Sequence, residues 1–311
     1  MPIKVPDNLP AQATLEDEGV LLISEQVALR QDVRPLEIAL LNLMPEKIKT
    51  ETQISRLLGA TPLQIELTLL TTSSYAPKNT SAEHMLAFYQ SWEAVRGRKF
   101  DGLIVTGAPI ETLPFQDVVY WRELTQIFDW SQTHVQESYF ICWGAQAALQ
   151  HFHGVPKYEL PAKMFGIFPH RVRAGRDGLL RGFDDDILVP VSRHTEVRRE
   201  DIPESEGVAV LLESDEAGLC LLRDEGRRQT FMFNHLEYDT GTLADEFHRD
   251  RAAGMEIAVP VNYFPGDDAD RPPVNRWRAH GSLLVGNWIY DLYQSTSFAL
   301  ENIPEIRRQS R

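Results

Sequence analysis

Apolar runs and amphipathic stretches alternate along the first half of the chain. Near-continuous apolar runs, which are typical of strands buried on both faces, occupy residues 36–44, 64–70, 101–109 and 138–141. Stretches with helical spacing follow them, from Pro45 to Gly59 and over 82–95 (after Ser81 as N-cap), 116–134 and 143–153. Because strands and helices alternate over short connections, we predict an α/β fold with a doubly wound, mostly parallel sheet.

The pattern changes beyond residue 160. Two short apolar segments, GVAVLLES at 207–214 and GLCLLRD at 218–224, flank the residues DEA and predict a hairpin, so the sheet should gain antiparallel strands. The remaining expected elements are a strand at 229–235, helices at 242–254 and 282–294, and a long loop at 262–281. We divide the chain into an N-terminal arm (1–35), one large domain (36–300) and a C-terminal tail (301–311).

Composition narrows the class of protein. The 311 residues carry a formal net charge of −14, which would repel a nucleic-acid backbone. The start MPIKVPDNLP has no apolar signal-peptide stretch, and no apolar run reaches the roughly 20 residues of a membrane span. Two cysteines without CxxC spacing indicate neither a disulfide framework nor a zinc site. We expect a soluble, cytoplasmic protein without a metal, a nucleic-acid partner or a membrane partner.

Cys142, in the stretch YFICWGAQAAL, is the first candidate for chemistry. It stands where a predicted strand gives way to a helix of small residues. The unpaired amides of a helix N-terminus favour an anion there, so they would make the thiol more reactive and could receive an oxyanion. A lone free cysteine is more often a buried packing residue, which is our interpretation of Cys220 in GLCLL.

His235 and Glu237 are the partners that favour a nucleophile at Cys142. They follow the predicted strand at 229–235, and in a parallel sheet they would face the same crevice as Cys142. In such a set the imidazole takes the thiol proton, the carboxylate orients the imidazole, and the thiolate attacks an acyl carbon. The sequence therefore predicts a Cys-His-Glu triad.

A strand, an elbow cysteine, a helix and a later HxE pair resemble the flavodoxin-like fold of the class I glutamine amidotransferases. The glutaminases of that group have a GxCxG pattern around the nucleophile, whereas this chain has Phe140 at the first glycine position and retains only Gly144. A cysteine amidase or glutaminase therefore remains an alternative. A second alternative, from a different class, is a non-catalytic binding protein that uses Cys142 as a redox sensor.

Seven blocks in order resemble the homoserine O-acyltransferase family, the transsuccinylases and transacetylases of methionine biosynthesis. The blocks are NLMPEKIKTETQ (42–53), DGLIVTGAP (101–109), CWGAQAAL (142–149), RGFDD (181–185), HLEYD (235–239), NYFP (262–265) and WRAHG (277–281). The resemblance implies an acyl-CoA co-substrate, L-homoserine as acceptor, an acyl-cysteine intermediate, no permanently bound cofactor and a homodimer.

The same resemblance assigns roles to individual residues. It makes Cys142 the nucleophile, His235 the proton acceptor and Glu237 its supporting carboxylate. The substrate-binding positions that it implies are Lys163, Ser192 and Arg249. A guanidinium such as that of Arg249 binds an amino-acid carboxylate in bidentate fashion. From its place in the run DEFHRDR alone, Arg249 would pass for a solvated surface residue.

Glu111, in TGAPIE, bears on the acyl donor. In the family, glycine at this position is associated with succinyl-CoA and glutamate with acetyl-CoA. A glutamate fills space and repels the free carboxylate of a succinyl group, so we expect an acetyltransferase, with succinyl-CoA as the alternative donor. On the sequence alone, Glu111 could equally be a solvent-exposed loop residue.

Two further pairs of residues have hypothetical roles. The backbone N–H of Trp143 and another N–H from the Gly107 loop are the expected oxyanion donors. Lys47 and Lys49 are candidate contacts for the phosphates of coenzyme A, although an exposed basic helix face would explain them as well.

Overall fold

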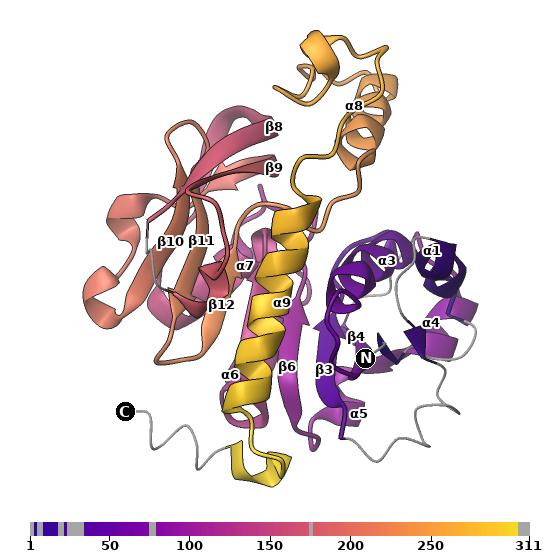
Figure 1. Cartoon of the computed structure of the whole chain (residues 1–311), viewed down its shortest axis with the longest axis vertical. Coiled ribbons are helices and arrows are strands. Elements are labelled where there is room, and N and C mark those ends of the chain that lie inside the picture. The colour runs from indigo at the N-terminus through magenta and orange to yellow at the C-terminus, as the bar shows by residue number, and fades with distance from the viewer. Residues whose placement is uncertain are drawn as a thin grey trace.

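The fold is one mixed β-sheet covered by helices on both faces (Figure 1). The computed structural model describes residues 3–4, 9–17, 22–23, 34–74, 79–173 and 177–303. Within these ranges the strand order is β2-β1-β4-β3-β6-β7-β12-β11-β10-β8-β9, and β5 pairs with β4 beside this path.

The strands are β1 (Ile3–Lys4), β2 (Leu22–Ile23), β3 (Leu36–Leu41), β4 (Ile65–Thr71), β5 (Tyr89–Ser91), β6 (Phe100–Val105), β7 (Val135–Ile141), β8 (Tyr158–Val172), β9 (Asp186–Glu196), β10 (Val208–Ser214), β11 (Gly218–Asp224) and β12 (Gln229–Met232). The α-helices are α1 (Ala11–Asp17), α3 (Lys47–Leu58), α4 (Ala82–Phe88), α5 (Trp92–Val95), α6 (Trp121–His134), α7 (Trp143–His153), α8 (Thr242–Ala252) and α9 (Arg278–Ser295).

The sheet has a parallel half and an antiparallel half. All pairs from β2 through β12 along the sheet order are parallel. The pairs that follow, from β12 through β11, β10 and β8 to β9, are antiparallel. The predicted hairpin is β10–β11, and the predicted fold class of a mostly parallel sheet with added antiparallel strands is confirmed.

Alternate residues of the central strands point to opposite layers. Ile38 and Leu40 belong to the buried cluster that contains side chains of α3 and α9. Ala39 and Leu41 belong to the cluster on the other face, which contains side chains of α6 and α7. A strand that is buried on both faces needs an apolar residue at nearly every position, which accounts for the continuous run at 36–41.

Several predicted boundaries were wrong. The single helix expected at 82–95 is two short helices, because the three residues of β5 pair with β4 between them. Ser81 does cap α4, accepting the N–H of His84 at 3.2 Å, and Ser91 caps α5 in the same way.

Other elements also begin or end at different residues. The helix expected from 116 begins at Trp121, after a 3₁₀ turn, and the strand expected to 235 ends at Met232. The last helix begins at Arg278 instead of 282, because the Asn275 side chain accepts the N–H groups of Trp277 and Arg278 and starts the helix early.

Segment 1–35 is described only in parts. Those parts add β1, β2 and α1 to the edge of the sheet next to β4, and Leu15 of α1 is fully buried. Of the predicted tail, residues 304–311 lie outside the described ranges. No helix in the described ranges has the length and apolar character that crossing a bilayer would require.

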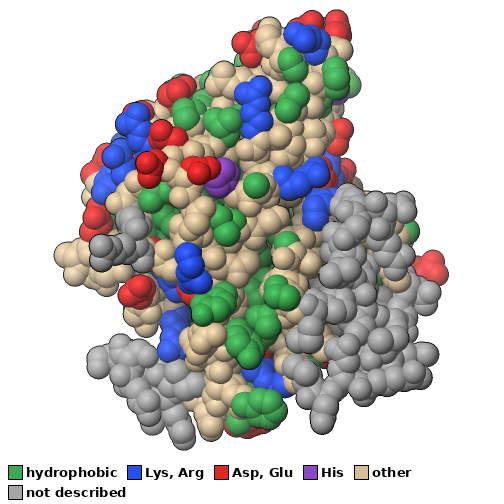
Figure 2. All heavy atoms as spheres, in the orientation of Figure 1, with side chains coloured by type: hydrophobic (Ala, Val, Ile, Leu, Met, Phe, Trp, Pro, Cys, Tyr) green, Lys and Arg blue, Asp and Glu red, His purple; other side chains and the backbone are tan. Residues whose placement is uncertain are grey.

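The long β8–β9 hairpin and α8 lie together at one end of the molecule (Figure 1). Helix α9 runs down the middle of the visible face. Figure 2 shows apolar side chains gathered in the middle of this face, where α9 runs, and charged ones mostly above and beside them. Tyr290 and Tyr293 of α9 are 46% and 55% exposed. The helix therefore presents aromatic surface to solvent as well as to the core.

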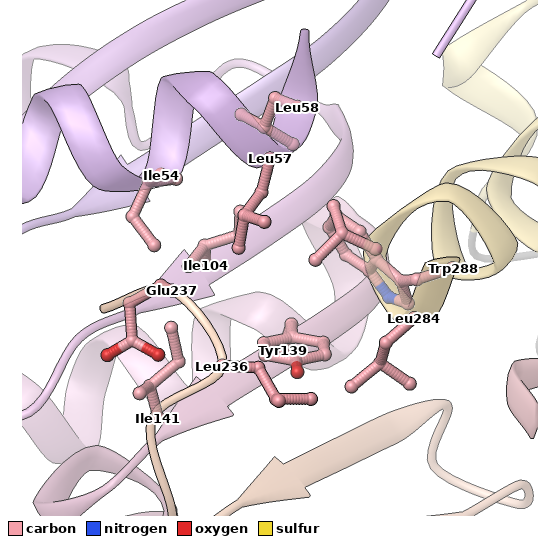
Figure 3. Close-up of a pocket in the computed structure, with 11 residues that line it drawn as sticks. Ile54, Leu57, Leu58, Ile104, Tyr139, Ile141, Leu236, Glu237, Leu284 and Trp288 are labelled. Carbon is pink, nitrogen blue, oxygen red and sulfur yellow. The ribbon is translucent and has the colours of Figure 1, made fainter. Parts of the chain in front are cut away.

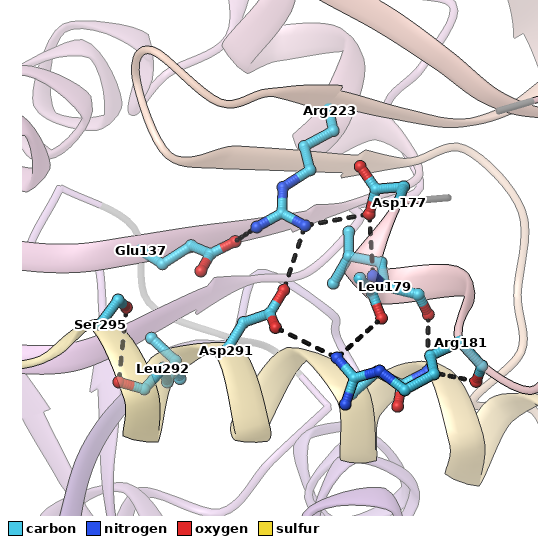
Figure 4. Close-up of polar contacts among 10 residues, drawn as sticks. Glu137, Asp177, Leu179, Arg181, Arg223, Asp291, Leu292 and Ser295 are labelled. Carbon is cyan, nitrogen blue, oxygen red and sulfur yellow. Dashed lines mark hydrogen bonds and ion pairs between the residues drawn. The ribbon is translucent and has the colours of Figure 1, made fainter. Parts of the chain in front are cut away.

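A buried ionic cluster fastens α9 to the sheet (Figure 4). Arg223 of β11 lies 3.0 Å from Asp177, 3.1 Å from Asp291 of α9 and 3.5 Å from Glu137 of β7. Arg181 approaches Asp291 at 3.7 Å. Burial raises the pKa of Glu137 to about 7, because Arg223 shares its charge among three carboxylates and offsets only part of the desolvation.

Glu137 should make the free energy of unfolding depend on pH. A carboxyl whose pKa is higher in the folded state binds more protons there, so its stabilisation is present below the unfolded value of 4.5 and is lost as pH rises towards 7. We expect the Glu137→Gln variant to lose less stability than the wild type between pH 5 and pH 8, measured by urea unfolding. Asp186→Asn, at a 67% exposed side chain, is the control. Equal pH slopes for Glu137→Gln and the wild type would contradict the assignment.

Candidate active site

Cys142 occupies a sharp turn between β7 and α7. Its backbone has φ 52° and ψ −120°, a conformation that a non-glycine residue adopts only when its surroundings hold it there. The Cys142 N–H donates to the Met232 carbonyl at 2.7 Å, and the Cys142 carbonyl accepts the N–H groups of Ala145 and Gln146. The thiol is half-buried at the N-cap of α7, as the sequence predicts for a nucleophile elbow.

Two glycines allow this turn to pack closely. A methyl carbon on Gly144 would lie 2.6 Å from the Thr106 carbonyl oxygen, so only glycine lets α7 approach the end of β6. A methyl carbon on Gly107 would lie 3.1 Å from Cβ of Cys142. The Gly107 loop therefore borders the thiol directly. Trp143 supplies the first amide of α7, which has no partner within the helix. The oxyanion roles of Trp143 and Gly107 remain a prediction.

The pairing of β12 with β7 brings His235 and Glu237 to the same edge. The two strands are parallel, with Met232 opposite Ile141, so the residues that follow each strand leave the sheet side by side. The His235 N–H donates to the Pro190 carbonyl of β9 at 2.9 Å, which holds the loop in place. The imidazole Nδ1 lies 2.6 Å from Oε1 of Glu237.

The groups around His235 favour its charged form. Burial disfavours the charged form of His235, but the Glu237 carboxylate and the Cys142 thiolate outweigh burial and raise the pKa of His235 well above its usual value. The Tyr238 ring stacks on the imidazole with centroids 4.1 Å apart, which further restricts the ring. The raised pKa favours the imidazolium form of His235 beside Cys142.

An apolar wall lies behind Glu237 (Figure 3). Glu237 lines a small pocket with Ile104, Ile141 and Leu236, and its side chain is only 10% exposed. Because little water reaches this carboxylate, its attraction for the imidazolium is screened less than at a surface. The group formed by Cys142, His235 and Glu237 thus has a solvent-poor side at Glu237 and an open side at Cys142.

The open side is a pocket of mixed polarity that gathers the predicted binding residues. Lys163 comes from β8, Ser192 from β9, Arg249 from α8 and Glu111 from the loop after β6. All four line the pocket together with Cys142 and His235. The structure therefore brings together residues from four separate elements that sequence reasoning linked only through a family resemblance.

Glu246, which the sequence analysis missed, also lines this pocket and connects three of its polar side chains. Its carboxylate accepts from the Ser192 hydroxyl at 2.5 Å and from the Tyr238 hydroxyl at 3.0 Å, and it pairs with the Lys163 ammonium at 3.0 Å. Burial opposes its charge, but Lys163 and Ser192 more than offset burial and lower the pKa of Glu246. Its position three residues before Arg249 on α8 was a usable signal, because residues at that spacing share a helix face.

Arg249 and Asp250 extend the pocket towards solvent. The Arg249 guanidinium pairs with the buried Asp250 at 2.6 Å, while its side chain stays 67% exposed. Arg249 is therefore partly the surface residue that its sequence context suggests, yet it also borders the pocket. A site with two cations and several carboxylates suits a zwitterionic ligand.

Glu111 is not the exposed loop residue that was one interpretation of the sequence. Its Oε2 is buried and has no hydrogen-bond partner among the described residues. Burial raises the pKa of Glu111, against the opposing effects of the His194 backbone N–H and of nearby His194, His235 and Lys163. The side chain narrows the pocket next to the nucleophile.

The structure does not support Lys47 as a phosphate contact. Lys47 is 4% exposed and its ammonium donates to the Asn42 carbonyl within the protein. Burial lowers the pKa of Lys47 to about 8. Lys49 remains accessible, lies 2.8 Å from Asp245, and borders a second polar pocket that adjoins the first at Arg249. Cys220 is fully buried, and burial raises the pKa of its thiol to about 12, so its interpretation as a packing residue is confirmed.

Comparison with known proteins shows which protein family this chain resembles. A family model described as homoserine O-succinyltransferase matches residues 2–298. A protein of Hyphomonas neptunium named homoserine O-acetyltransferase is 59% identical over 303 residues, which make up 97% of this chain and 99% of that protein. A protein of Brucella canis with the same name is 57% identical over 306 residues, 98% of this chain and all of that protein.

Solved structures resemble the chain in fold. A glutamine amidotransferase of Thermotoga maritima has a TM-score of 0.55 at 12% identity and covers 84% of this chain and 99% of its own. A glutamine amidotransferase of Methylobacillus flagellatus has a TM-score of 0.53 at 13% identity and covers 86% of this chain and 99% of its own. At these identities the likeness shows a shared class I glutamine amidotransferase-like fold.

Removing the charge of Glu237 should lower the pKa of His235 and weaken its support for a reactive Cys142. In Glu237→Gln the amide can still contact His235, but the stabilisation of the imidazolium is lost. We expect alkylation of Cys142 by iodoacetamide at pH 7 to slow by about tenfold or more, with partial recovery in Glu237→Asp. Peptide mass mapping separates Cys142 from the buried Cys220, which should not react in the folded protein. An unchanged alkylation rate would show that Glu237 does not support the reactivity of Cys142.

Proposed function

The chain belongs to the homoserine O-succinyltransferase family, and on that premise we propose that it is an acyltransferase that moves acetyl from acetyl-CoA to the hydroxyl of L-homoserine. The product would be O-acetyl-L-homoserine, and the reaction would belong to methionine biosynthesis. The observation that carries the proposal is the Cys142–His235–Glu237 set, with the thiol at a strained turn and Nδ1 of the imidazole 2.6 Å from the carboxylate.

In the first half-reaction the Cys142 thiolate attacks the thioester carbon of acetyl-CoA. The new carbon–sulfur bond forms as the bond to the coenzyme A sulfur breaks, and the His235 imidazolium gives its proton to the leaving thiolate. The Trp143 and Gly107 amides border the place where the oxyanion develops. One thioester replaces another, so little free energy is lost in forming the acyl-enzyme.

In the second half-reaction the homoserine hydroxyl attacks the acyl-cysteine. The now neutral His235 accepts the hydroxyl proton through Nε2, and the bond between the acyl carbon and Sγ breaks to restore the thiolate. Glu237 stabilises the imidazolium that re-forms. Tyr238, stacked on the ring, keeps the same nitrogen directed at the pocket through both steps.

The polar side of the pocket is suited to the acceptor. Arg249 can bind the carboxylate of homoserine, and Glu246 and Asp250 can bind its ammonium group. Ser192 and Lys163 already hold the Glu246 carboxylate in place. An amino acid bound across these groups would extend its hydroxyl towards Cys142.

Acetyl is the proposed acyl group for two reasons. Glu111 fills the space beside the nucleophile with a buried carboxyl group. The relatives at 57–59% identity are named acetyltransferases, and they match nearly the full length of the chain. Succinyl-CoA is the second candidate donor, because the family model itself is described as a succinyltransferase.

Glutamine hydrolysis and redox sensing are less favoured. The amidotransferase structures share the fold at 12–13% identity, which does not extend to their reactions. A sensor would not need the polar groups that surround Cys142.

We further propose that the enzyme is cytoplasmic and has no resident metal or cofactor. We also propose that it acts as a homodimer, for which the exposed tyrosines of α9 offer an apolar surface.

The acyl-cysteine can be detected as a change in intact mass. After brief exposure to acetyl-CoA without homoserine, the wild-type protein should gain one acetyl group, and the Cys142→Ala variant should gain none. Homoserine should then remove the adduct. An adduct from succinyl-CoA alone would keep the mechanism and overturn the choice of donor. Transfer without any adduct would overturn the acyl-cysteine route.

Glu111 should determine the donor. In Glu111→Gly the pocket beside Cys142 gains space and loses a carboxyl group, so we expect kcat/KM for succinyl-CoA to rise by about tenfold or more relative to acetyl-CoA. Glu159→Gly, on β8 outside this pocket, is a matched control. If the ratio of the two donors does not change, Glu111 is not the selecting residue.

A further inference from the structure

An apolar groove adjoins the catalytic pocket on the side of the Gly107 loop. It is lined chiefly by Leu43, Pro45, Ile110, Leu113, Val118 and Val119. Several of these side chains face solvent: Val119 is 76% exposed and Leu113 is 44% exposed. Neither the triad nor the polar residues of α8 extend into it.

The groove and the catalytic pocket form one path. Ala108 and Pro109 line both, and Met44 of the pocket lies between Leu43 and Pro45 of the groove. The shared wall is the loop that also carries Gly107 against Cys142 and Glu111 beside it. Lys157 holds this loop from outside through the carbonyl groups of Glu111 and Leu113. An extended ligand bound in the groove would therefore lie along this loop, which Lys157 holds in place, and could reach the Cys142 thiol.

We propose that this groove binds the pantetheine arm of the acyl-CoA donor. This assignment rests on the proposed function. The arm is uncharged: its methylene and gem-dimethyl carbons are interrupted by two amides and a hydroxyl, and it ends in the thioester that must reach Cys142. Among the described residues that line the groove, Asp117 is the one charged side chain, so the groove suits the carbon-rich parts of the neutral arm and not the phosphates of coenzyme A.

A second pocket, which shares Met44, Glu246 and Arg249 with the catalytic pocket, suits the arm less well. This pocket is bordered by Lys49 and Arg249 and by the carboxylates of Glu46, Asp245 and Glu246. Burying a neutral chain against these groups would desolvate charges without giving them partners. The donor arm and the acceptor would thus contact different residues around Cys142.

The test compares donors that share the acetyl thioester but differ in the arm. They are acetyl-CoA, S-acetylpantetheine and N,S-diacetylcysteamine, which lacks most of the arm. A carboxylate placed in the groove by Val119→Asp or Leu113→Asp should lower kcat/KM for the first two donors by about tenfold. The value for N,S-diacetylcysteamine and the KM for homoserine should not change. Both positions are exposed, so the variants should fold, and Leu86→Asp at an 87% exposed position of α4 is the control.

Each other outcome contradicts the assignment. If the groove variants keep the wild-type kcat/KM for acetyl-CoA, or lose kcat/KM equally for all three donors, the arm binds elsewhere. If the groove variants lose activity and their oligomeric mass in solution also changes, the groove is a contact between copies of the protein and not a donor site. If the wild-type protein transfers acetyl from none of the donors, the proposed function fails first and the assignment of the groove fails with it.

Discussion

The parallel pairing of β7 with β12 is the constraint on which the site depends. It places Ile141 opposite Met232, so the chain leaves both strands at the same edge. The Cys142 N–H then donates to the Met232 carbonyl, which helps to hold Cys142 at a positive φ that it would not otherwise keep. A shift of this register by one residue would turn the side chains of β12 to opposite faces and separate His235 from Cys142.

The antiparallel half of the sheet contributes most of the polar lining of the pocket. The proposed nucleophile, base and carboxylate follow parallel strands, whereas the proposed substrate-binding residues Lys163 and Ser192 lie on antiparallel strands. The β8–β9 hairpin brings Lys163 and Ser192 over the triad, and both bind Glu246 of α8. The Pro190 carbonyl of the same hairpin accepts the His235 N–H, so the binding layer also positions the base. Strand β9 therefore contacts both His235 and the polar side of the pocket.

Features that produce a local sequence pattern were predicted, and features that depend on tertiary contacts were missed. Buried parallel strands are continuous apolar runs, so their order along the chain and the two strand ends that carry Cys142 and His235 could be recognised. Strand β5 could not, because it is formed by three residues whose pairing with β4 is a tertiary contact. The interior position of Lys47 was missed for the same reason: its partner is a backbone carbonyl that no residue pattern announces. Glu246 was missed because a carboxylate within a charged helix has the same pattern whether it faces water or a pocket, and only its spacing of three residues from Arg249 could have singled it out.

The choice of acyl group does not depend on whether Glu111 is ionised. Burial favours its neutral form, while His194, His235 and Lys163 favour its charge. A charged Glu111 would repel a succinyl carboxylate directly. A neutral Glu111 would still occupy the space that the longer acyl chain needs. The role proposed for Glu111 would therefore rest on charge repulsion in the ionised form and on the shape of the pocket in the neutral form.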